Sequence, residues 1–218
     1  QKPHPPLWVA ALQPSTYQLA AEKGIGVLSF GASAPEVLKP HIDAYHERVR
    51  DAEPVGAVIN DQWCSSTLGY CGEDNKEARE LTVESIKNFF GPGRPYVQDQ
   101  KDIYARLLEN WGGVPDHLEQ NFRRFVDLEG EEKEEVVDLS GGGAVAYAIW
   151  NRMDADTLCD RGVVIGGDPD SCIEGVKLHQ ESGADQLLLL MQCDQVPHEK
   201  VMSSIELFGR EVIPAFRR

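Results

Sequence analysis

The chain has 218 residues, of which 41% are hydrophobic and 26% are charged, and this provides enough apolar material for one sizeable core or two small ones. Its 36 acidic and 21 basic residues give a formal net charge of −15 at pH 7, which repels phosphate backbones and anionic lipids and argues against nucleic acids and membranes as partners. Residues 1–6 lack the pattern of an export signal, and no run approaches the roughly 20 apolar residues of a membrane helix, so we expect a cytoplasmic protein.

Four short apolar runs predict the strands of a parallel sheet. They cover residues 7–11, 26–30, 55–60 and 186–191. None of them alternates apolar with polar residues, which is typical of strands that are covered on both faces. Amphipathic helical patterns separate the runs, and this alternation predicts an α/β fold with helical crossovers.

Capping signals indicate where several of these helices begin. Asp74 precedes a helical pattern after the third run, and Asp168 with Pro169 begins another just before the last run. In the terminal helix, the spacing predicts that Val201 and Ile205 share the buried face. Helix capping is also the preferred interpretation of the glycine-rich turn at residues 166–169, although such a turn can cradle a phosphate.

The long stretch before that turn is irregular and is punctuated by glycine and proline. We interpret residues 91–158 as a helical insertion between the last two predicted strands, within one domain that spans residues 1–218. The acidic run at residues 129–135 inside it is expected to be a solvated helix face.

Five cysteines are spread along the chain at Cys64, Cys71, Cys159, Cys172 and Cys193. Their number is odd, no C-x-x-C pair occurs, and no histidines stand at zinc-ligand spacing. We therefore expect reduced thiols and no metal site. Cys64 and Cys71 are expected in a polar loop, where a redox or metal role is the less favoured alternative.

Two stretches resemble one known family. Residues 5–24 contain PPLWVAA, PSTY and LAAEKG, similar to the strand, helix start and A-A-x-x-G ending found midway through bacterial luciferase-like monooxygenases. Residues 164–214 contain VIGGDPD, GADQLL, SIELF and EVIP, which resemble the closing motifs of the same family. The order and spacing of these pieces agree with the family together.

This resemblance implies a TIM (β/α)8 barrel, of which the chain holds only strands five to eight, with residues 7–11 as strand five. Half a barrel exposes two strand edges and an open core. We therefore expect a fragment of a longer polypeptide, or else a missing N-terminal half supplied by a second chain, or two copies that pair. A homo- or heterodimer is the corresponding expectation for assembly.

The resemblance also implies an enzyme: a flavin-dependent monooxygenase that uses reduced FMN, supplied by a flavin reductase, and O2 to oxygenate a small organic substrate. An F420-dependent oxidoreductase of the same fold is one alternative. A truncated, non-catalytic subunit that binds flavin or a partner is another. The family residues that act in catalysis lie mostly in strands one to four, so we name no catalytic residue.

Active sites of such barrels lie at the carboxyl ends of the strands. The resemblance implies that the flavin phosphate binds at the helix start after the first run, whose amide groups suit an anion, and that the flavin ring lies at the end of the second run. Simple capping and core packing are the alternatives there. The cofactor candidates are Gln13, Ser15, Thr16, Ser29, Phe30 and Gly31.

The end of the third predicted strand supplies the substrate-side candidates, for which a solvated loop is the alternative. They are Asn60, Asp61, Gln62 and Trp63.

Overall fold

The computed structural model describes residues 2–30, 33–89, 153–193 and 196–217. Its strands are β1 (Trp8–Ala11), β2 (Gly26–Phe30), β3 (Trp63–Cys71), β4 (Ile165–Gly167) and β5 (Gln186–Leu190). Its α-helices are α1 (Pro14–Glu22), α2 (Pro35–Arg48), α3 (Asn75–Phe89), α7 (Ala155–Asp160), α8 (Pro169–Glu181) and α9 (His198–Leu207). Short 3-10 turns follow α2 at Val49–Asp51 and end the chain at Ile213–Phe216, and a π-helical turn at Phe208–Val212 extends α9.

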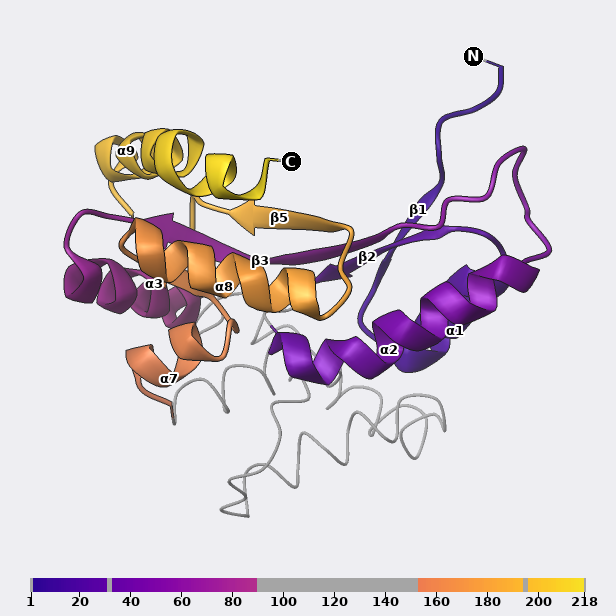
Figure 1. The fold of residues 1–218 in the computed structure, drawn as a ribbon, viewed down its shortest axis with the longest axis horizontal. Helices are drawn as coiled ribbons and strands as arrows, with labels where there is room; N and C mark the ends of the chain where they lie inside the picture. Colours follow the sequence, from indigo (N-terminus) through magenta and orange to yellow (C-terminus); the bar gives the residue numbers. More distant parts are fainter. Residues whose placement is uncertain (1, 31–32, 90–152, 194–195, 218) are drawn as a thin grey trace, which may run out of the picture.

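All strand pairings are parallel within the described residues, and β3 is the centre of the sheet. β1 pairs with β2, and β2 pairs with the first half of β3. On β3, residues 64–68 pair with β5 and residues 69–71 pair with the short β4. The chain is therefore an α/β fold built on a parallel sheet with helical crossovers, as the alternating pattern predicts (Figure 1).

The first, second and last predicted strands are confirmed, but the third is wrong. Residues 55–60 form a loop in which Val55 is 61% exposed and Ile59 is 47% exposed. The strand instead begins at Trp63 and ends at Cys71, within the stretch predicted to be a polar loop. β4 was missed as well, because its three residues, IGG, look like a turn. The predicted insertion consequently precedes β4 and does not separate the last two strands.

Residues 90–152 of that insertion lie outside the described residues, and its described end belongs to the fold. Asp154 caps α7, since its side chain accepts a hydrogen bond from the amide of Thr157 at 2.7 Å. Leu158 and Cys159 of α7 are buried against α3 residues such as Ile86. The last few residues of the predicted insertion thus pack into one of the cores.

The predicted caps of α3 and α8 are confirmed. The side chain of Asp74 accepts a hydrogen bond from the amide of Glu77 at 2.9 Å, and that of Asp168 accepts one from the amide of Ser171 at 2.9 Å. The terminal helix differs from prediction at Ile205, which is 45% exposed although its neighbour on the predicted face, Val201, is buried.

Helices α1 and α2 cover one face of the sheet at β1 and β2. Ala11, Val27 and Trp63 point to this face and pack in one core with Tyr17 of α1 and Ile42 of α2. Figure 1 shows α1 and α2 side by side along this part of the sheet. This core fixes the position of the carboxyl ends of β1 and β2.

The opposite face is partly open in the described structure. Leu28 is paired with Ala10, and side chains of paired residues lie on the same face of a sheet. Leu28 is 36% exposed, and Leu188 of β5 is 53% exposed. The only described partner of β1 is β2, so β1 stands at an edge of the sheet.

Candidate functional site

The helix start after β1 and the end of β2 lie next to each other. Ala11 is the register partner of Ser29 in the parallel pair β1–β2, so the residues that follow both strands emerge at the same edge of the sheet. The structure therefore brings the candidate phosphate residues 13–16 close to the candidate ring residues at the end of β2.

The start of α1, where the phosphate is predicted, has few amides to offer an anion, because Pro14 has none and the amides of Thr16 and Tyr17 donate to the carbonyl of Gln13 at 2.9 and 3.2 Å. Gln13 is extended (φ −112°, ψ 137°), and no side chain caps the helix there. Pro14 occupies the first turn, which contains no acidic residue. Ser15 is exposed and Thr16 is half-buried. Within this first turn, the positive end of the helix dipole therefore meets no carboxylate.

The end of β2 offers mainly backbone to a ligand. Ser29 is buried on the helix-covered face, where its partners in register are Ala11 and Ser65. Its carbonyl accepts a hydrogen bond from the hydroxyl of Ser66 at 2.8 Å. Phe30 pairs with Ser66 through the backbone, while its side chain and Gly31 lie outside the described residues.

Ser66 lies beside the end of β2 and is a further candidate site residue that the sequence does not predict. It lies in register with Phe30 on one side and with Leu188 on the other, so its side chain lies on the partly open face. It is half-buried. The error in the third strand hid it, because residues 63–71 contain too few aliphatic side chains to resemble a buried strand.

The four substrate-side candidates lie at the amino ends of the strands, although they were expected at the carboxyl ends. Residues 60–63 precede or begin β3, so they lie at its amino end, and the reason for choosing them is wrong. Asn60 donates from Nδ2 to the carbonyl of Leu7 at 2.9 Å, and its own carbonyl accepts a hydrogen bond from the hydroxyl of Tyr45 at 2.8 Å. Asn60 therefore joins the segments that precede β1 and β3.

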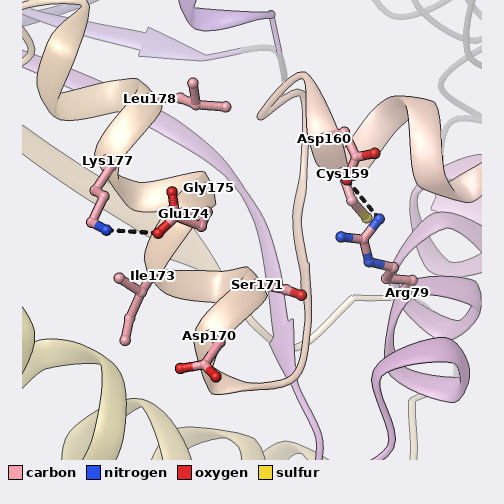
Figure 2. A pocket seen from close by; sticks show the side chains of 10 residues that line it. All are labelled: Arg79, Cys159, Asp160, Asp170, Ser171, Ile173, Glu174, Gly175, Lys177 and Leu178. Carbon is pink, nitrogen blue, oxygen red and sulfur yellow. Dashed lines mark hydrogen bonds and ion pairs between the residues drawn. The ribbon is translucent and has the colours of Figure 1, made fainter.

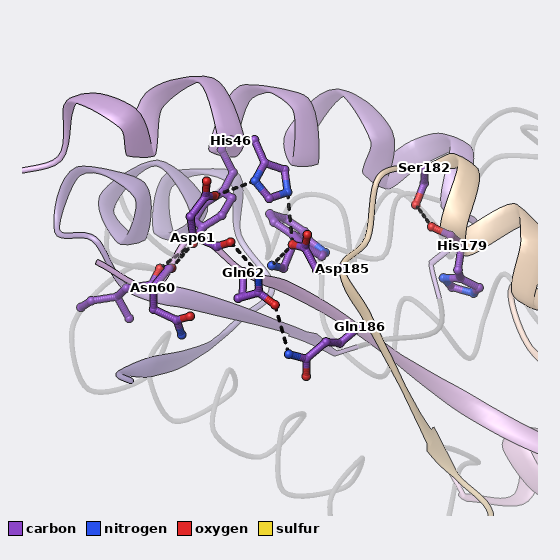
Figure 3. Close-up of polar contacts among 11 residues, drawn as sticks. His46, Asn60, Asp61, Gln62, His179, Ser182, Asp185 and Gln186 are labelled. Carbon is purple, nitrogen blue, oxygen red and sulfur yellow. Dashed lines mark hydrogen bonds and ion pairs between the residues drawn. The ribbon is translucent and has the colours of Figure 1, made fainter. Parts of the chain in front are cut away.

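A polar network continues around this amino edge (Figure 3). His46 of α2 lies between two carboxylates, 2.6 Å from Asp61 and 3.4 Å from Asp185. Asp185 also accepts a hydrogen bond from the amide of Trp63 at 2.7 Å. These contacts tie α2 to the starts of β3 and β5, which indicates a structural role.

The side chains of the other two candidates also have partners. Gln62 accepts a hydrogen bond from Gln186 at 3.2 Å. Trp63 has no exposed surface, and its ring centroid lies 4.7 Å from that of Tyr17 and 5.6 Å from that of Tyr45. Trp63 is thus a core residue beneath the helices and does not line an open site.

The glycine-rich turn before α8 is held by neighbouring polar groups. Asn75 accepts hydrogen bonds at 3.0 Å from the amide of Asp168 and from the hydroxyl of Ser171. Gly167 has a φ of +136°, and a Cβ there would lie 2.7 Å from that of Ser171. Because the amide and the cap are already used within the protein, the geometry agrees with the structural interpretation of this turn.

A surface pocket of about 540 Å3 lies among α3, α7 and α8 (Figure 2). All of its lining residues are helical. Its basic groups are paired with acidic ones: Arg79 lies 2.7 Å from Asp160, and Lys177 lies 2.6 Å from Glu174. No strand end reaches this pocket, and we do not assign it to a cofactor.

The described residues contain neither a candidate metal site nor a helix that could cross a membrane. No three histidine, cysteine or acidic side chains there are grouped as they would be around a metal ion. None of the helices in these residues is both long enough and apolar enough to cross a membrane.

Comparison with known families decides the assignment. The model of a family described as luciferase-like monooxygenase matches residues 1–186. The chain belongs to the luciferase-like monooxygenase family. A comparison with curated proteins found no match.

Several solved structures share the fold of this family member. The monooxygenase RslO1 from Streptomyces bottropensis superposes with a TM-score of 0.60 at 17% identity, over 100% of this chain and 50% of its own. The coenzyme F420-dependent tetrahydromethanopterin reductase from Methanopyrus kandleri has a TM-score of 0.55 at 21% identity, over 97% and 51% of the two chains.

A third relative was solved with FMN. The oxygenating constituent of 3,6-diketocamphane monooxygenase from Pseudomonas putida gives a TM-score of 0.52 at 21% identity, over 97% of this chain and 48% of its own. The present chain thus spans about half the length of these relatives.

Proposed function

We propose that the protein is a flavin-dependent monooxygenase, in which reduced FMN and O2 oxygenate a small organic substrate. The observation that carries this proposal is the family match together with the geometry at one edge of the sheet. There the uncapped start of α1, without acidic residues in its first turn, lies beside the end of β2. An F420-dependent oxidoreductase is the second candidate, because one similar structure depends on that coenzyme.

The protein would use its residues to bind and orient the cofactor. The amide of Ser15 and the hydroxyls of Ser15 and Thr16 would donate to the phosphate, with the dipole of α1 favouring its charge. Gln13 is a weaker donor candidate. The end of β2, with Ser29, Phe30 and Gly31, and the neighbouring Ser66 of β3 would lie against the ring and exclude water from it. When bound and reduced, the flavin supplies the reaction with oxygen.

The proposed barrel needs four further βα units, and β1, β2, β3 and β5 would be its strands five to eight. The outer edge of β1, which has no partner among the described strands, and the exposed Leu28 and Leu188 support this, because an isolated half-barrel leaves such groups in water. We propose that an N-terminal half of the same polypeptide supplies these units. A separate chain and a second copy are the alternatives.

The outer side of α9 supports the same conclusion. Met202, Ile205 and Ile213 are 44%, 45% and 50% exposed and lie along one stripe of the helix and its extension. Gly209 lies in this stripe, and no atom comes within 4 Å of where its Cβ would be. An apolar stripe with a small residue at its centre suits close packing of a helix, which the first helix of the missing half would provide.

Cofactor titration with an oxygen assay tests the proposed function. The full-length protein is mixed with FMN and, separately, with F420 while absorbance between 300 and 500 nm is recorded, and O2 consumption is then followed with chemically reduced FMN. We expect a spectral change with FMN and a rate of O2 uptake that the protein changes from that of free reduced FMN, which reacts with O2 by itself. Binding of F420 without O2 uptake would favour the second candidate, and binding of neither would contradict both.

A charge at Thr16 is expected to weaken FMN binding on the order of 100-fold, because a carboxylate would face the phosphate in Thr16→Glu. Thr16→Ser retains the hydroxyl and should bind FMN with nearly unchanged affinity. Fluorescence titration measures both dissociation constants, and circular dichroism checks that the variants are folded. Equal affinities for the two variants would place the phosphate elsewhere.

A further inference from the structure

Two of the five cysteines meet where β3 ends and α8 begins. Cys71 and Cys172 have no exposed surface and belong to one core cluster with Phe208 and Val212 of the π-helical turn. The sulfur of Cys172 lies 3.7 Å from the carbonyl oxygen of Gly167, which is the register partner of Cys71.

The same sulfur is held on its other side by the residue before Cys71. It lies 3.9 Å from the carbonyl oxygen of Tyr70, so the Cys172 side chain packs against the end of β3 in the core cluster that also contains Cys71. The two cysteines are 101 positions apart, and Cys71 lies in a stretch predicted to be a loop, so the sequence does not predict that they are neighbours.

The two thiols differ in acidity in a way that suits reaction with each other. A hydrogen bond from Cys172 lowers the pKa of Cys71, because it stabilises the thiolate. Its bond to Cys71 and then its burial raise the pKa of Cys172. By contrast, burial raises the pKa of Cys159 to about 11. Cys71 is therefore the better nucleophile, and Cys172 is the partner that holds the proton.

We propose that Cys71 and Cys172 form a reversible disulfide under oxidising conditions, a modification site that fastens the start of α8 to the end of β3. A hydroperoxide is the oxidant. The Cys71 thiolate attacks one peroxide oxygen, the O–O bond breaks, and a sulfenic acid forms as the leaving oxygen is protonated. The sulfur of Cys172 then attacks the sulfenic sulfur, the S–O bond breaks and water leaves. With hydrogen peroxide, two thiols are oxidised to one disulfide while the peroxide is reduced to two waters.

Burial controls access to this pair. The hydroxyl of Ser204 in α9 accepts a hydrogen bond from the amide of Cys71 at 2.8 Å, and the π-helical turn covers the same core. Oxidation therefore requires a local opening of the C-terminal helix, and small oxidants are favoured over large ones. The bond closes a loop that contains residues 90–152, and loops of this length give large entropic stabilisation.

Peptide mapping after oxidation tests the proposal. The full-length protein is treated with hydrogen peroxide, free thiols are alkylated under denaturing conditions, and linked peptides are identified by mass spectrometry with and without dithiothreitol. We expect a reducible link between Cys71 and Cys172 and a rise in Tm on the order of 10 °C. Recovery of both cysteines as alkylated thiols would overturn the proposal, and so would a link that joins either of them to a different cysteine.

Matched variants separate chemistry from folding. Cys172→Ser should leave Cys71 as a sulfenic acid that dimedone traps, whereas Cys71→Ser should give no trapped product at position 172. Cys64→Ser removes a thiol outside the pair and should form the same link as the unmodified protein. Trapping of Cys172 in the Cys71→Ser variant would contradict the assignment of Cys71 as the nucleophile. This test needs no flavin, so its failure would leave the proposed function unaffected.

Discussion

Replacing Trp63 with alanine is expected to lower the free energy of unfolding by about 3–5 kcal/mol, the usual cost of removing a large aromatic side chain from a core. Trp63 has no exposed surface and packs against Tyr17 and Tyr45 between the sheet and two helices. Its removal would leave a cavity that neighbouring rings cannot fill without moving. Urea denaturation of the full-length protein at pH 7 measures the effect.

Gln62→Ala is the matched control, because it changes the preceding residue, whose side chain is partly exposed and makes two hydrogen bonds, one with Gln186 at 3.2 Å and one to the carbonyl of Asp61 at 2.9 Å. We expect a loss below about 1 kcal/mol for this variant. Trp63→Phe should fall between the two. If Trp63→Ala kept its stability and instead raised KM for the substrate, the placement of Trp63 in the core would be wrong.

Stability is expected to fall between pH 6.5 and pH 4 because of His179. Burial lowers the pKa of this side chain to about 4, against the opposing effects of its hydrogen bond to Gly162 and of Glu36. The unfolded chain binds a proton near pH 6.5 while the folded chain stays neutral. Above pH 6.5, His179 is neutral in both the folded and the unfolded chain, so it does not reduce the free energy of unfolding. As the pH falls to 4, protonation of the unfolded chain lowers that free energy by about 3 kcal/mol.

The geometry explains the neutral form of His179. Nε2 lies 3.0 Å from the carbonyl oxygen of Gly162 and must donate to it, while Nδ1 is buried and has no hydrogen-bond partner among the residues that the structure describes. A second proton on the ring would therefore be a charge without a partner in the core. His179→Gln can donate the same hydrogen bond and does not titrate. Urea denaturation of both proteins at several pH values should give a shallower pH dependence for the variant, and parallel curves would contradict this explanation.

The parts of the fold that the sequence predicted correctly have local causes. Asp74 and Asp168 cap helices through hydrogen bonds to amides three residues later, and such bonds depend only on neighbouring residues. β2 and β5 are largely apolar runs, which are typical of strands in a parallel sheet. These features can be recognised from a short stretch of sequence.

The errors arose where tertiary contacts override the local pattern. β3 contains Ser65 and Thr67, both buried, and Thr67 is tolerated there because its hydroxyl donates to the distant carbonyl of Val163 at 2.6 Å. Val55 and Ile59, in contrast, look like a strand but are exposed in a loop. The Asp74 cap was the available clue, since a strand normally ends a few residues before the helix that follows it.

Only part of the candidate site was predicted correctly, because the prediction of each residue depended on the strand beside it. Residues 13–16 and Ser29 follow or end correctly predicted strands, so the structure brings them to one edge of the sheet. Residues 60–63 depended on the wrong strand and lie at the opposite edge. The pairing of Cys71 with Cys172 depends on a contact between distant segments, which no local pattern indicates.

Hydrogen exchange of the full-length protein with and without cofactor tests the central claim most directly, namely that a flavin or deazaflavin binds where β1 and β2 end. We expect FMN or F420 to slow exchange of the amides of residues 15–17 and 29–30 and to leave residues 60–63, at the amino ends of the strands, unchanged. Protection of residues 60–63 by a cofactor that binds, with no change at the ends of β1 and β2, would contradict it.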